Sequence, residues 1–123
     1  MLSPDERRKI VSETVKMKTG AMKLFYGCTG NNTAGTIEYV HHAAKEGADG
    51  AVIAVPSYIC PPEDDAVRYV LEVCDASEMP IGFYNNPPRV KTDVSAEGVL
   101  RMAEHPNMVL VKEATSRVGH MGE

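Results

Sequence analysis

The feature that most constrains this chain is the regular return of short apolar runs. Four runs begin at Lys23, Gly50, Pro80 and Asn107, so successive starts are 27, 30 and 27 residues apart. Aliphatic, β-branched and aromatic residues fill the runs, which favours strands, and the stretches between them have apolar residues at helical spacing. This alternation predicts right-handed βαβ crossovers and a parallel sheet, in the order α-β-α-β-α-β-α-β.

Helix-start and helix-stop residues support the four expected helices. The sequence Ser3-Pro4-Asp5-Glu6 combines a serine N-cap, proline at the first helical position and glutamate at the capping-box position. We expect this helix to stop at Gly20. The other helix boundaries are expected at Thr33 and Gly47, near Glu63, and at Ser95.

Two architectures fit this order: a doubly wound sheet and part of a (β/α)8 barrel. A dinucleotide-binding sheet normally shows a GxGxxG turn after its first strand, and Gly27-Cys28-Thr29-Gly30 does not match it. The even spacing of the strands favours the barrel. The continuous apolar run of residues 108–111 also predicts a strand covered on both faces, as in a parallel sheet.

Composition excludes several classes of function. The net charge of −4, without a basic stretch, argues against nucleic-acid binding. Apolar runs are far shorter than the roughly 20 residues that span a bilayer, and residues 1–6 lack a signal-peptide core. Cys28, Cys60 and Cys74 are widely spaced, which indicates a reducing compartment, without a disulfide framework or zinc site. We expect a cytoplasmic protein.

Three expected strands carry a reactive side chain at or just after the carboxyl end: Tyr58, Tyr84 and Lys112. In a parallel barrel these ends face one mouth, where ligands bind. A neutral lysine amine can attack a ketone to form a Schiff base, and burial or a nearby cation lowers its pKa from about 10.4 towards about 7–8. A tyrosine hydroxyl could move protons there, and Arg89 could hold a substrate carboxylate.

Each of these residues also has an ordinary structural interpretation. Lys112 could extend to water from a strand end. The tyrosines could fill the barrel rim with their rings, and Arg89 could be a solvated loop residue. The adjacent residues Asn85-Asn86-Pro87-Pro88 are compatible with any turn.

Tyr84-Asn85-Asn86-Pro87 and, further on, Val111-Lys112-Glu113-Ala114-Thr115 resemble motifs of the dihydrodipicolinate synthase and N-acetylneuraminate lyase family. The resemblance runs essentially end to end. It includes Leu2 to Arg7, the turn from Gly27 to Ala34, and Pro56-Ser57-Tyr58 with Pro61. It implies a (β/α)8 barrel and a Schiff-base lyase that acts through pyruvate.

The resemblance also implies roles for individual residues. Lys112 would form the Schiff base and Tyr84 would transfer protons above it. Tyr58 would reach into a neighbouring subunit, making a homo-oligomer part of the site, and Arg89 would bind the carboxylate of the second substrate. The implied small molecules are a 2-keto acid such as pyruvate and an aldehyde, with no cofactor and no metal.

The sequence also departs from the family pattern. The family's Gly-Thr-Thr-Gly-Glu turn, which binds the pyruvate carboxylate, is absent, and the resemblance covers only the central strands of the family fold, three to six. A barrel needs about 250 residues, so we expect residues 1–123 to be a single fragment, about half a barrel. The fragment could be inactive alone or could serve as an assembly module. Val90-Lys91 replace the usual Thr-Gly, which leaves a keto-deoxy sugar-acid aldolase or a hydratase-aldolase open.

Overall fold

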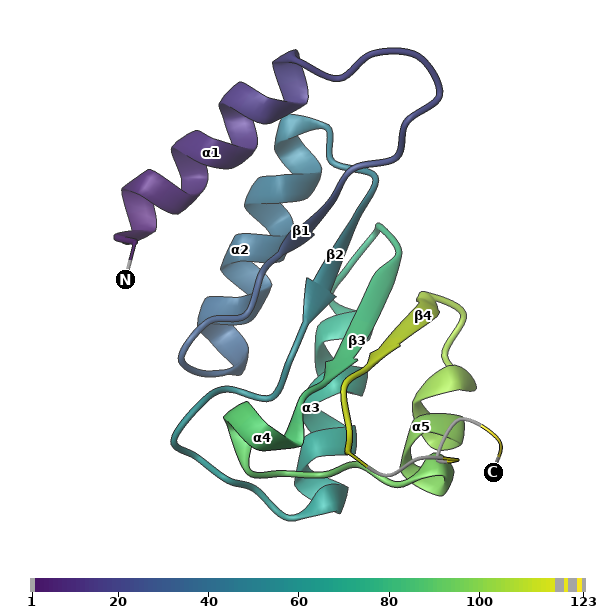
Figure 1. Ribbon diagram of the computed structural model, residues 1–123. Helices are drawn as coiled ribbons and strands as arrows, with labels where there is room; N and C mark the ends of the chain where they lie inside the picture. The colour runs from purple at the N-terminus through teal and green to yellow at the C-terminus, as the bar shows by residue number, and fades with distance from the viewer. Residues whose placement is uncertain (1, 117–118, 120–121, 123) are drawn as a thin grey trace.

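The computed structural model describes residues 2–116, 119 and 122 as four strands and five helices. The elements are α1 (Pro4–Lys16), β1 (Phe25–Gly27), α2 (Thr33–Glu46), β2 (Gly50–Ile53), α3 (Glu63–Asp75), β3 (Ile81–Asn85), α4 (Pro87–Val90), α5 (Ala96–Ala103) and β4 (Met108–Glu113). The strands form one parallel sheet in the order β1-β2-β3-β4. The predicted parallel α/β topology is confirmed (Figure 1).

Local sequence explains where the helices start and stop. Ser3 and Glu6 form the predicted capping box of α1, and Ser95 caps α5 by accepting a hydrogen bond from the N–H of Gly98. Gly47 ends α2 in a left-handed conformation with φ of +98°, which glycine adopts without strain. Asn32, one residue before the expected Thr33, caps α2.

Two boundaries differ from the sequence prediction. Helix α1 ends at its C-cap Met17, before Gly20. The short helix α4 occupies the segment expected to be a turn, because Pro87 and Pro88 have the fixed φ that suits the first helical positions. Lys91 ends α4 with φ of +62°.

The core lies between the sheet and the helices behind it in the view of Figure 1. The side chains that fill this layer include Ile53, Ile81 and Phe83 from the sheet, Val40 from α2, Val67 and Val70 from α3, and Met102 from α5. Among the described residues no helix is long and apolar enough to cross a membrane.

The expectation that residues 108–111 are covered on both faces is wrong for the described residues. Val109 is 52% exposed and Leu110 37% exposed, since β4 is an edge strand and the helices cover only one side of the sheet. On the open face Leu110 lies over Gly82, and the ring of Phe25 lies over Gly50. Large side chains therefore fill the space that each glycine leaves on this face.

Candidate functional site

Lys112 and Tyr84 lie side by side at the carboxyl ends of β4 and β3. The two residues are register partners, so their side chains leave the sheet on the same face. Lys112 Nζ lies 4.3 Å from the centroid of the Tyr84 ring, within the range of a cation–π contact. The structure therefore joins two of the predicted site residues.

The environment of this pair is open and polar. The Tyr84 hydroxyl accepts a hydrogen bond from Asn86 Nδ2 at 3.0 Å, which orients the phenol. Lys112 is exposed at the end of β4.

Asn85 and Glu113 leave the two strands on the opposite face, directly behind this pair. Asn85 is 1% exposed, and its Nδ2 lies 3.0 and 3.2 Å from the two carboxylate oxygens of Glu113. The same Nδ2 lies 3.2 Å from the carbonyl oxygen of Val94 and 3.2 Å from Asp93 Oδ1. The ends of β3 and β4 are thus connected through side chains as well as through the backbone.

Tyr58 and Arg89 lie on segments near the same end of the sheet, but apart from the pair. The Tyr58 side chain is 95% exposed, in the loop between β2 and α3. Its φ of +73°, with +47° at Cys60, is unusual for residues other than glycine, and such strain is frequent at functional sites. Arg89 is exposed in α4, at the carboxyl end of β3 (Figure 1).

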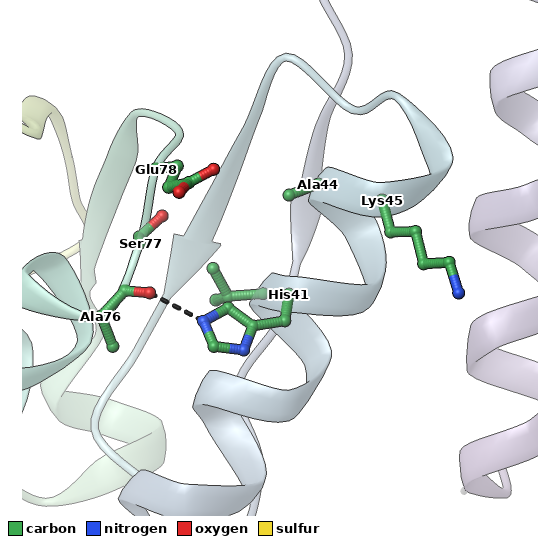
Figure 2. A pocket seen from close by; sticks show the side chains of 7 residues that line it. His41, Ala44, Lys45, Ala76, Ser77 and Glu78 are labelled. Carbon is green, nitrogen blue, oxygen red and sulfur yellow. Dashed lines mark hydrogen bonds between the residues drawn. The ribbon is translucent and has the colours of Figure 1, made fainter.

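A separate hollow of about 430 Å³ lies between the second half of α2 and the turn after α3. His41 Nε2 is 2.7 Å from the carbonyl oxygen of Ala76 there. Figure 2 shows Lys45 directed away from His41 and Glu78. Because these polar groups do not converge on one point, the hollow lacks the arrangement expected of a ligand site.

Sequence reasoning missed the contributions of Asn85, Asn86 and Glu113. In the sequence the two asparagines are compatible with an ordinary turn, and Glu113 is one residue of the motif around Lys112. One signal was available. Asn85 and Glu113 each follow a candidate site residue by one position, so strand alternation places them together on the opposite face.

Comparisons with known proteins identify the family of this chain. The Dihydrodipicolinate synthetase family matches residues 1–123. The 4-hydroxy-tetrahydrodipicolinate synthase of Sphingopyxis alaskensis is 36% identical over 114 residues, which are 93% of this chain and 39% of that protein.

Solved structures of similar proteins have the same arrangement of elements. Dihydrodipicolinate synthase from Aquifex aeolicus superposes with a TM-score of 0.92 at 30% identity, covering 98% of this chain and 42% of that one. The chloride-inhibited dihydrodipicolinate synthase from Acinetobacter baumannii, complexed with pyruvate, gives 0.92 at 30% identity, covering 98% and 41%. The chain spans about 40% of the length of these relatives. Its fold is part of a (β/α)8 barrel, and the chain belongs to the Dihydrodipicolinate synthetase family.

Proposed function

We propose that this protein is a lyase in which Lys112 forms a Schiff base with pyruvate or a related 2-keto acid. The observation that carries the proposal is the position of Lys112 Nζ, 4.3 Å from the ring centroid of Tyr84 at the carboxyl end of the sheet. Relatives named 4-hydroxy-tetrahydrodipicolinate synthase and a neighbour complexed with pyruvate support the choice of substrate.

The chemistry requires the amine to be neutral when it reacts. Lys112 Nζ attacks the C2 carbonyl carbon, a C–N bond forms, and the carbonyl oxygen becomes the hydroxyl of a carbinolamine. Loss of a proton from nitrogen and of the hydroxyl as water gives the imine. The imine withdraws electrons from C3, so a C3 proton can leave and C3 can bond to an aldehyde carbon, or the reverse reaction can cleave that bond.

Tyr84 is assigned the proton transfers in this sequence. Its hydroxyl would protonate the departing carbinolamine oxygen and later return a proton, which is general acid–base catalysis. The hydrogen bond from Asn86 Nδ2 supports this role because it holds the phenol in one orientation.

Tyr58 and Arg89 are assigned roles that extend beyond the Lys112–Tyr84 pair. In this proposal, β1–β4 correspond to barrel strands three to six. The exposed Tyr58 enters the site of a neighbouring subunit in a homo-oligomer, and Arg89 binds the carboxylate of an aldehyde substrate. The near-complete exposure of the Tyr58 ring supports an intermolecular contact.

Borohydride trapping tests the role of Lys112. We expect pyruvate with borohydride to add one pyruvic acid minus one oxygen to the wild-type mass, because imine formation releases one water and reduction adds two hydrogens. Peptide mapping should place this adduct on Lys112. Lys112→Arg should abolish the adduct, because a guanidinium stays protonated. Lys45→Arg, an exposed lysine of α2, is the matched control.

The outcomes separate the proposal from its alternatives. An adduct on a different lysine would overturn the assignment. A folded wild-type protein that forms no adduct would favour a non-catalytic member of the family. If the adduct forms, turnover with aldehydes that do or do not carry a carboxylate will separate a synthase-type condensation from cleavage of a sugar acid.

A further inference from the structure

Asn85 is a buried polar residue at the point where β3 ends. Its backbone carbonyl accepts a hydrogen bond from the N–H of Ala114 at 2.9 Å, and its side-chain Oδ1 accepts one from the N–H of Val94 at 3.3 Å. Nδ2 faces the Glu113 carboxylate, the Val94 carbonyl and the Asp93 carboxylate. The orientation of the amide follows from this set, because reversing it would place Oδ1 against carboxylate oxygens.

The hydrogen bonds of Asn85 act in two directions. A side-chain amide has two N–H groups, so one can serve Glu113 on β4 while the other serves the segment that leads into α5. Charge-assisted hydrogen bonds to a carboxylate are stronger than those between neutral groups, and low exposure strengthens them further. Asn85 therefore links β3, β4 and residues 93–94 through one buried group.

This link lies immediately behind the Lys112–Tyr84 pair. Asn85 pairs with Glu113 in the register, one position after Tyr84 pairs with Lys112. Strand β4 lies at the edge of the sheet, where Val109 is 52% exposed and Leu110 37% exposed, so packing on its open face fixes it only in part. A shift of the β4 end relative to β3 would move the amine away from the phenol.

We propose that Asn85, acting through Glu113, is a positioning residue that fixes Lys112 over Tyr84. Its relevance to the reaction rests on the proposed function of Lys112, whereas the geometry can be tested without any substrate. The amide also separates two carboxylates, so an acid at position 85 would bring a third negative charge among them and push the β4 end outward.

Three variants test the role of this amide. Asn85→Asp removes the donor and adds charge, Glu113→Ala removes the acceptor, and Glu113→Gln keeps an oxygen acceptor of the same length. Glu72→Gln, at an exposed position in α3, is the matched control for the loss of a carboxylate. Urea unfolding of each variant identifies any that does not fold.

Two readouts are measured on each folded variant. The first is the proton chemical shift of the Lys112 ε-methylene group. We expect the Tyr84 ring to move this shift upfield in the wild type, because the amine lies over the ring. The second is the rate of pyruvate trapping at saturating pyruvate. A residue that serves stability alone would leave the shift of the folded protein and this limiting rate unchanged.

We expect Asn85→Asp and Glu113→Ala to lose the upfield shift and to trap pyruvate about 10²-fold more slowly. Glu113→Gln should keep most of the upfield shift and of the trapping rate, and Glu72→Gln should leave both readouts unchanged. If Asn85→Asp does not fold, the difference in chemical shift and trapping rate between Glu113→Ala and Glu113→Gln tests the inference. A wild-type shift retained in folded Glu113→Ala or Asn85→Asp overturns the inference. A wild type that shows the shift but forms no adduct overturns the proposed function alone.

Discussion

Lys18 Nζ lies 2.6 Å from Asp49 Oδ2, and this ion pair connects the segment after α1 to the turn before β2. The same carboxylate oxygen accepts a hydrogen bond from the backbone N–H of Leu24 at 2.8 Å. The hydrogen bond from Lys18, together with that from Leu24, lowers the pKa of Asp49 from 3.8 to about 2. Asp49 therefore fixes the entry to β1 beside β2.

We expect Asp49→Asn to lower the free energy of unfolding at neutral pH. A carboxyl group whose pKa is lower in the folded state stabilises that state above its unfolded pKa, and this contribution disappears as the pH falls through the folded pKa. The difference between wild type and variant should therefore shrink between about pH 4 and about pH 2. Urea unfolding across this range measures it, and a constant difference would contradict the explanation.

Two glycine substitutions should differ in their cost because different neighbours meet the added methyl group. A Cβ at Gly30 would lie 2.7 Å from backbone atoms of Gly35 and Thr36, whereas a Cβ at Gly82 would lie 2.5 Å from Cδ1 of the partly exposed Leu110. Backbone in a helix cannot yield as a flexible side chain can. We expect Gly30→Ala to lower the free energy of unfolding by about 1–3 kcal/mol and Gly82→Ala by less. Urea unfolding of both variants tests the order, and the opposite order would contradict this packing argument.

The three cysteines should react at very different rates. Burial raises the pKa of Cys28 and of Cys74 to about 11, whereas Cys60 is exposed in the loop after β2. Because the thiolate is the reactive form, iodoacetamide should modify Cys60 in the folded protein and the other two only after unfolding. Peptide mapping over time measures this order. Cys60→Ser should remove the fast phase, and fast labelling of Cys28 in the folded protein would contradict the burial argument.

Much of the fold could be predicted from local sequence. Ser3, Gly47 and Ser95 each fix a helix boundary through interactions within a few residues, so their signals do not depend on the rest of the fold. The exposure of Val109 and Leu110 could not be predicted in this way. An apolar run shows that a strand can be buried on both faces, but whether both faces are covered depends on the neighbouring elements.

The candidate site also has features that follow from the order of elements and features that depend on details of the sheet. Parallel strands place Tyr84 and Lys112 at one end of the sheet, so their proximity follows from the order of elements. The contact between Asn85 and Glu113 joins residues 28 positions apart. Strand alternation places both residues on the opposite face, but the exact pairing of Asn85 with Glu113, like that of Tyr84 with Lys112, depends on a register that shifts between Ile81 and Gly82. This irregularity has no local sequence signal.

We expect Arg89 to distinguish between the possible second substrates of the proposed lyase. Its side chain is exposed in α4, at the carboxyl end of β3, outside the contact between Lys112 and Tyr84. We expect Arg89→Ala to leave pyruvate trapping unchanged. Turnover with an aldehyde that carries a carboxylate should fall by about 10- to 10²-fold, the cost of a lost charge-assisted hydrogen bond of roughly 1.5–3 kcal/mol.

Steady-state kinetics with two aldehydes, one with and one without a carboxylate, measure this selectivity. Arg68→Ala is the matched control, because Arg68 is an exposed arginine of α3 whose guanidinium pairs with Asp65 in the same helix. A loss confined to the acidic aldehyde would assign Arg89 to its carboxylate, since only that substrate offers the charge. An equal loss with both aldehydes would show that Arg89 acts on the shared chemistry, and the assignment of a carboxylate-binding role would be wrong.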